Sequence, residues 1–230
     1  MSGGLTRGAR DSLALGLALV PIGLAFGYVA EVAGLTWWMA GLMSLITYAG
    51  PSQFLAVGLL GVGAGIPAIV ATVLVANLRY TLFAASLAPH LRDAPRRRLP
   101  LLAHGLADGS YAVTLQEATD HPERPRLDRY LMGSMIVSFG FWVPSSVAGS
   151  LIGDALPEAV AFGLGFATPA IFIAFLVAGM RDAIGVAVML VAGLGSVAGQ
   201  DVLPTGTAPI VAIVVASTLG GTLTWQRRPR

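Results

Sequence analysis

The sequence predicts an all-α, polytopic membrane helical bundle that forms a single transmembrane domain over residues 1–230. Hydrophobic residues make up 55% of the chain and charged residues 11%, whereas roughly 25% of the residues in soluble domains are charged. The apolar stretch 41–88 contains one charged side chain, Arg79. This stretch is longer than the roughly 20 residues that one helical crossing needs. These observations place most of the chain in a lipid bilayer.

The apolar runs predict about seven transmembrane helices, because each run has a length that fits one crossing. The runs are 12–33, 36–61, 64–88, 130–152, 157–179, 183–199 and 207–225. The first run resembles a signal peptide, but we expect a retained helix because further spans follow at once. An eighth segment, 99–118, is apolar only in patches. It fits a short buried helix, a re-entrant element or an eighth crossing.

Arginine placement predicts the orientation, because cytoplasmic loops carry an excess of positive charge. With seven crossings, the arginine cluster within 92–98 and the C-terminal arginines share the cytoplasmic side, and Arg7 and Arg10 lie outside. With eight crossings, the N-terminus becomes cytoplasmic and the four-arginine cluster moves outside. We favour seven, since four misplaced arginines are less favourable than two.

Two helices are predicted to be broken by proline, at Pro51 and at Pro169. Proline lacks a backbone donor and clashes with the preceding turn, so each break can begin a half-helix inside the bundle. Val20-Pro21 and Val143-Pro144 add a second pair of similar positions. These pairs suggest an inverted repeat of residues 12–88 and 130–225, joined by 89–129. The alternative is that Pro and Gly recur by chance in a chain rich in both.

Polar side chains beside the breaks and within the third run predict a substrate site. The positive end of a half-helix is suited to bind a carboxylate, although a kink packed on its neighbours would explain the same residues. An Asn or Arg side chain at membrane depth must find a partner or face water. The candidate binding residues are Ser52, Gln53, Asn77, Arg79, Asp108 and Thr168, with helix breaks at Pro51 and Pro169.

Arg79 and Asp108 each have a structural and a functional interpretation. Arg79 either forms an ion pair with Asp108 that holds two parts of the bundle together, or lines a cavity, and both can be true. Asp108 either takes up a proton or an ammonium group, or is a solvated residue that caps a short helix. Trp142 is interpreted as an interface anchor or as packing.

Composition excludes several function classes. The chain has no Cys, which excludes disulfides and thiolate metal sites, and its three His have no metal-ligand spacing. It has no Lys and therefore no G-x-x-x-x-G-K-[ST] nucleotide loop, and its net charge of +2 is no nucleic-acid signal. We expect no metal, no cofactor and no nucleic-acid partner. Energy would then come from an ion gradient or a partner protein.

Three functions remain open from the residues alone: a secondary transporter for a small neutral amino acid, an intramembrane hydrolase that uses Asp108, or a non-transporting structural subunit. Aspartyl hydrolysis needs two carboxylates that share a proton, and no second acidic residue lies clearly at membrane depth. Two polar helix breaks would be surplus in a structural subunit. We therefore favour the transporter, and expect no enzymatic activity.

The order of Ala49-Gly50-Pro51-Ser52-Gln53-Phe54, Asn77-Leu78-Arg79-Tyr80 and Asp108 resembles the AzlC family over nearly the whole chain. That family forms the large subunit of branched-chain amino acid exporters, with usual strings close to AGxxQF, NLRH and DE. Here Tyr80 replaces the usual His and Gly109 the usual Glu, which puts the coupling in question. The resemblance implies a multi-pass inner-membrane permease that exports Val, Leu, Ile or Met with a small AzlD-type subunit.

Overall fold

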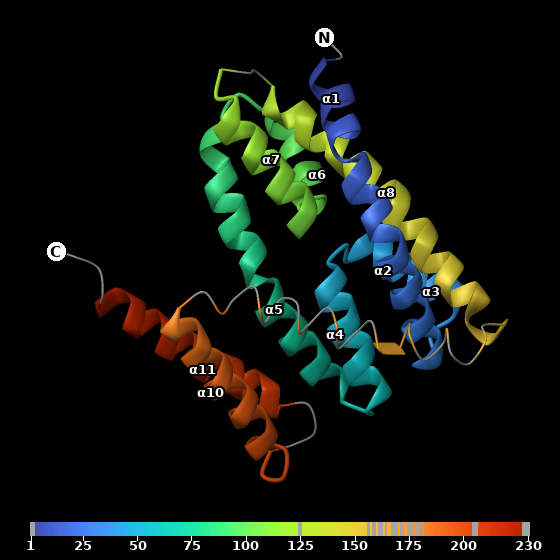
Figure 1. The fold of residues 1–230 in the computed structure, drawn as a ribbon, viewed down its shortest axis with the longest axis vertical. Helices are drawn as coiled ribbons and strands as arrows, with labels where there is room; N and C mark the ends of the chain where they lie inside the picture. Colours follow the sequence, from blue (N-terminus) through green and yellow to red (C-terminus); the bar gives the residue numbers. More distant parts are fainter. Residues whose placement is uncertain are drawn as a thin grey trace.

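The computed structural model describes residues 3–123, 126–155, 182–203 and 207–226, together with single residues between 157 and 180. Every regular element in these described parts is a helix, so the prediction of an all-α bundle is confirmed (Figure 1). The elements are α1 (Gly3–Asp11), α2 (Leu13–Val32), α3 (Trp37–Ile46), α4 (Gly50–Gly61), α5 (Ile66–Leu87), η1 (Ala88–Leu91), η2 (Arg96–Arg98), α6 (Leu99–His104), α7 (Asp108–Asp120), α8 (Leu127–Ile152), η3 (Gly153–Ala155), α10 (Ala183–Gly199) and α11 (Ala208–Gln226).

Three helical stretches of the described chain are long and apolar enough to cross a membrane. They are Leu13–Val32, Ile66–Leu91 and Leu127–Ile152. Shorter apolar helices accompany them at Trp37–Ile46, Ala183–Gly199 and Val211–Leu223. The chain is therefore a helical membrane protein.

Helices α2 and α8 lie side by side and run in the same direction (Figure 1). Small residues allow this close approach. A Cβ atom added at Gly23 would lie 2.0 Å from Ser145 Oγ, and one added at Gly27 would lie 2.0 Å from the carbonyl oxygen of Ser146. The residue numbers of the contacting positions increase together along α2 and α8, so the two helices are parallel.

One end of the bundle collects arginine side chains, and we call it the arginine end. It is the end where α1 leads into α2 and where α8 begins. Arg7 of α1 forms an ion pair of 2.7 Å with Glu117 of α7, and Arg98 of η2 forms one of 2.7 Å with Asp128 of α8. Arg126 also contacts Asp128, at 3.2 Å. These pairs join four elements at this end, and α2 runs from here to the opposite, far end.

Helices α3 and α4 form a hairpin that enters from the far end, which we call the first hairpin. Gly41 of α3 lies beside Val147, while Tyr48 after α3 stacks on Phe139, so α3 runs opposite to α8. The chain turns at residues 47–49, and α4 then runs back along α2, with Phe54 against Phe26. The first hairpin thus begins and ends at the far end.

Helix α5 returns the chain to the arginine end, and η2, α6 and α7 then form a second hairpin that enters from there. Arg98 lies beside Asp128 and Gly105 beside Met135, so η2 and α6 descend along α8. Helix α7 ascends again, from Asp108 in the middle of the bundle to Glu117 at the arginine end. Figure 1 shows α6 and α7 between the upper parts of α5 and α8.

Helices α10 and α11 pack against each other in opposite directions, and α11 contacts α5 (Figure 1). Gly195 of α10 lies beside Ala212, and Gly220 of α11 lies beside Val188, which gives the antiparallel direction. Asp182 caps α10, because its Oδ1 accepts a 2.7 Å hydrogen bond from the Gly185 amide.

The run 36–61 was predicted to be one crossing with a break, and this arrangement is corrected. The break lies at the predicted place, but the two halves double back as the first hairpin instead of continuing to the other end. Segment 99–118 takes the re-entrant arrangement that the sequence left open. Because the first hairpin returns to the far end before α5 begins, Arg7 and Arg10 lie at the same end as Arg92–Arg98, which removes the conflict between the two arginine groups.

The predicted inverted repeat of residues 12–88 and 130–225 required α2 and α8 to run in opposite directions. They run in the same direction, so this pair of helices does not have the predicted relation. The other part of the prediction, the break at Thr168 and Pro169, lies outside the described residues.

Candidate functional site

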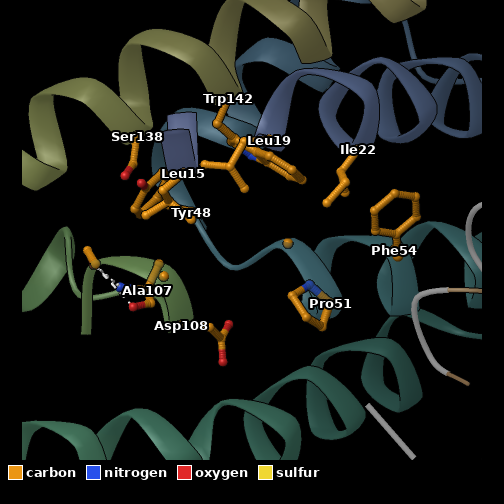
Figure 2. A pocket seen from close by; sticks show the side chains of 13 residues that line it. Leu15, Leu19, Ile22, Tyr48, Pro51, Phe54, Ala107, Asp108, Ser138 and Trp142 are labelled. Carbon is orange, nitrogen blue, oxygen red and sulfur yellow. Dashed lines mark hydrogen bonds between the residues drawn. The ribbon is translucent and has the colours of Figure 1, made fainter. Parts of the chain in front are cut away.

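A pocket lies in the middle of the bundle, where the ends of the two hairpins meet (Figure 2). We call the turns at residues 47–49 and 105–107 the first and second tips. The pocket has a volume of about 140 Å³ and lies between both tips, α2 and α8. Its lining is mostly apolar: Leu15, Leu19, Ile22, Tyr48, Gly50, Pro51, Phe54, Ala107, Asp108, Gly109, Ser110, Ser138 and Trp142.

The first tip is shaped by Tyr48, whose φ of 42° lies in the left-handed region that few side chains adopt. Stacking holds it there, because its ring lies 3.6 Å from the ring of Phe139, centroid to centroid. The strained residue turns the chain so that α4 begins directly at the pocket, with Pro51 in its first turn. Strain of this kind is stored where the surrounding packing supports it.

Gln53 fixes the first hairpin from within. Its side chain is fully buried and its Oε1 accepts hydrogen bonds from the Ala49 amide at 3.3 Å and from Trp142 Nε1 at 3.2 Å. Its Nε2 donates to Ser44 Oγ at 3.0 Å. Gln53 therefore joins α3, α4 and α8, and its place is behind the pocket wall. Trp142 is buried and lines the pocket, so its place is in the core and not at a membrane interface.

The second tip is closed by Ser110. The Ala107 amide donates to Ser110 Oγ at 2.9 Å, and the same hydroxyl donates to the Gly105 carbonyl at 2.9 Å. His104, just before this tip, connects it to the first hairpin through a 3.0 Å hydrogen bond between its Nε2 and the Leu45 carbonyl. Because a carbonyl only accepts, Nε2 carries the proton in this contact.

Asp108 begins α7 and is the one carboxylate among the described residues that line the pocket. Its Oδ2 accepts hydrogen bonds from Arg79 Nη2 at 3.1 Å and from Tyr80 OH at 3.3 Å. Arg79 also lies over the Tyr80 ring, 5.0 Å from its centroid. In Figure 2, Asp108 lies on the side of the pocket that faces α5, opposite Leu19 and Ile22 of α2.

Ser52 and Asn77 form a second polar pair that joins α4 to α5. Ser52 Oγ donates to Asn77 Oδ1, and the serine is almost completely buried. Asn77 and Tyr80, which bonds to Asp108, are three positions apart and therefore lie on the same face of α5. Both hairpins are thus tied to α5 through polar side chains.

The structure brings together five of the six predicted binding residues. Asp108 and the break residue Pro51 line the pocket itself. Arg79, Ser52 and Asn77 stand directly behind it on α5 and α4, while Gln53 supports the first tip. The sixth, Thr168, and Pro169 lie outside the described residues.

Sequence reasoning missed Tyr48, His104 and the pocket residues of α2 and α8. Nothing in a sequence pattern marks Tyr48, because the left-handed conformation follows from its stacking on Phe139. His104 gave only the signal of a histidine in a segment of mixed polarity. In the described part of the chain, no group of three or more His, Asp or Glu side chains is arranged to hold a metal ion.

Comparisons with known proteins extend over this whole arrangement. A family model described as AzlC protein matches residues 14–156. The inner membrane protein YgaZ of Escherichia coli K12 is 28% identical over 211 residues, which cover 90% of this chain and 85% of that protein. An uncharacterized membrane protein of Helicobacter pylori J99 is 31% identical over 163 residues, 70% of this chain and 69% of that protein.

A membrane protein from Archaeoglobus fulgidus, also uncharacterized, is 28% identical over 178 residues, 76% of this chain and 75% of that protein. No solved structure matches this chain. The matched range 14–156 contains α2, both hairpins, α5 and α8, so the similarity includes every helix that builds the pocket.

Proposed function

The chain belongs to the AzlC family, and we propose that it is a secondary transporter that exports small neutral amino acids across the cell inner membrane. The cargo would be a branched-chain amino acid or another with an apolar side chain, such as Val, Leu, Ile or Met. The lack of a nucleotide-binding loop supports ion coupling, and the resemblance to the family supports a small AzlD-type partner subunit.

The observation that carries this proposal is the composition of the pocket. It lies at the middle of a membrane bundle, where two helices begin at opposing tips, and it offers one carboxylate among apolar side chains. A neutral amino acid needs a group for its ammonium, a group for its carboxylate and an apolar surface for its side chain. A soluble cofactor or a nucleotide would need more polar contacts than this lining offers.

We assign Asp108 to the cargo ammonium and the first turn of α4 to the cargo carboxylate. Asp108 presents its carboxylate on one side of the pocket. The first turn of α4 carries the positive end of a helix dipole, and Gly50 and Pro51 of this turn also line the pocket. Arg79, Tyr80, Asn77 and Ser52 hold these groups in place, with Gln53 supporting the tip and Thr168 as a further candidate.

An enzymatic function is not supported by the same geometry. Two carboxylates that share a proton are required for aspartyl hydrolysis. Asp108 instead contacts an arginine and a tyrosine. A structural subunit would not need a pocket at the meeting point of two hairpins.

The test is uptake of a labelled branched-chain amino acid into proteoliposomes that contain the purified chain, with and without its small partner subunit. Two competitors probe the two charged ends: the matching amino alcohol, which lacks the carboxylate, and the matching carboxylic acid, which lacks the amine. We expect uptake that the unlabelled amino acid abolishes and neither competitor reduces. Effective competition by the amino alcohol would contradict the carboxylate site at α4.

A further inference from the structure

One arrangement occurs twice in the first 120 residues: a long helix that leads into a hairpin. Helix α2 leads into the first hairpin from the far end, and α5 leads into the second hairpin from the arginine end. The second helix of each hairpin begins at Gly50 and at Asp108, which are 58 positions apart. The first helices end at Ile46 and His104, again 58 positions apart.

The contacts within the two copies match as well. Phe26 of α2 packs edge-on against Phe54 of its hairpin, at 5.5 Å between centroids. Phe83 of α5 stacks on Tyr111 of its hairpin, at 4.0 Å. Both members of the second pair lie 57 positions after those of the first. In each tip, an alanine directly precedes the second helix of the hairpin, and its amide donates to a side chain of that helix. Ala49 donates to Gln53 in the first tip, and Ala107 donates to Ser110 in the second.

The equivalent stretches of the two long helices have opposite chemistry. On α2, Ile22, Leu19 and Leu15 precede Phe26 by 4, 7 and 11 positions, and all three line the pocket. On α5, Tyr80 and Asn77 precede Phe83 by 3 and 6 positions and bond to Asp108 and Ser52. One copy therefore faces the tips with alkyl groups and the other with polar groups.

We infer that residues 13–61 and 66–120 form an inverted repeat whose two long helices act on opposite ends of one cargo, α2 by direct contact and α5 through the Asp108 that it holds, and that Leu15, Leu19 and Ile22 on α2 set the size of the apolar side chain that is accepted. The polar face of α5 lies on the side of the charged end of the cargo. This inference rests on the proposed function, and it names the residues that determine specificity within that site.

The physical reason is that an apolar wall selects by shape. A cavity that loses one isobutyl group gains room for a larger side chain, and a hydrophobic pocket separates cargoes that differ by one or a few methylenes by about 10- to 200-fold. Loss of a polar contact on α5 affects the binding of the charged groups that all amino acids share. A substitution on α2 should therefore change which cargo is preferred, whereas a substitution on α5 should weaken the binding of every cargo.

The experiment measures competition by alanine, valine, leucine and phenylalanine against labelled leucine in proteoliposomes. We expect Leu19→Ala to shift the ratio of phenylalanine to alanine inhibition about tenfold towards phenylalanine. Leu19→Phe should shift it towards alanine. The matched control is Leu17→Ala, since Leu17 lies on the outer face of the same helix and is 61% exposed. Asn77→Ala should weaken all four competitors with their order unchanged.

An unchanged order in Leu19→Ala, or an equal shift in Leu17→Ala, would overturn the inference. If Leu19→Ala is not inserted stably, Leu15→Ala provides the same test one turn earlier. A parent protein that carries none of these amino acids would refute the proposed function. A parent that carries them, with variants of α2 that keep its order, would refute this inference alone.

Discussion

Exchange of the charges of Arg79 and Asp108 separates a structural role of this pair from a role in cargo binding. The atoms Arg79 Nη2 and Asp108 Oδ2 lie 3.1 Å apart and join α5 to α7. At this distance, an effective dielectric constant of about 20 gives a gross attraction of about 5 kcal/mol. The side chains are 28% and 33% exposed, so solvent screening and desolvation reduce the net value.

We expect a coupling free energy of about 1–3 kcal/mol, between the values for exposed pairs and for fully buried pairs. It is measured by a double-mutant cycle with Arg79→Met and Asp108→Asn, from unfolding of the purified protein in detergent. Each single variant should be less stable than the parent, and the double variant more stable than the sum of the two effects. Additive effects would show that the ion pair does not contribute to stability.

The swapped protein, Arg79→Asp with Asp108→Arg, then gives the decisive comparison. It restores an ion pair between α5 and α7 but places a guanidinium where the pocket had a carboxylate. If Asp108 binds the cargo ammonium, stability returns while transport stays absent. Transport at the parental rate in the swapped protein, at matched membrane expression, would show that the pair only holds the two helices together.

Two further predictions concern the packing and the orientation of the bundle. Gly27→Ala should destabilise the protein by about 1–3 kcal/mol, because the new Cβ would lie 2.0 Å from the Ser146 carbonyl oxygen. The control in thermal unfolding is Gly140→Ala, whose new Cβ would have no atom within 4 Å. Equal unfolding midpoints of the two variants would contradict the close contact of α2 and α8. Single cysteines introduced at Gly3 and Ala94 of this cysteine-free chain should be labelled from the same, cytoplasmic side of the membrane; labelling from opposite sides would refute the re-entrant course of the first hairpin.

Much of the fold was predictable, because the bilayer determines both how apolar a crossing helix must be and how long it must be. The break near Pro51 was also predictable, since Gly50 and polar residues accompany the proline there; a proline alone does not decide it, because Pro21 and Pro144 lie inside the continuous helices α2 and α8. The direction of the chain after the break was not. Whether α4 continues α3 or turns back depends on the left-handed Tyr48 and its stacking on Phe139, which are far apart in the sequence.

The candidate site divides in the same way. Arg79 and Asp108 were predicted as partners because a charge at membrane depth must be compensated, and they form an ion pair. The leucines of α2 could not be singled out, because an apolar residue facing a pocket has the same sequence pattern as one facing lipid. Leu19 lines the pocket while Leu17 is largely exposed, and only the packing of α2 against the tips distinguishes them.

The two hairpins are held by different kinds of contact, and these contacts set the cost of moving each one. Both tips end in the middle of the bundle, so a cargo can pass only if one of them is displaced. Moving the first hairpin breaks the buried hydrogen bonds of Gln53 to Trp142 and of Ser52 to Asn77, and each buried polar group left unpaired costs about 1–3 kcal/mol. Moving the second hairpin breaks the bond of His104 to the Leu45 carbonyl and the ion pairs of Asp108 with Arg79 and of Glu117 with Arg7. Among the described contacts, the first hairpin is therefore held by uncharged hydrogen bonds and the second mainly by ion pairs.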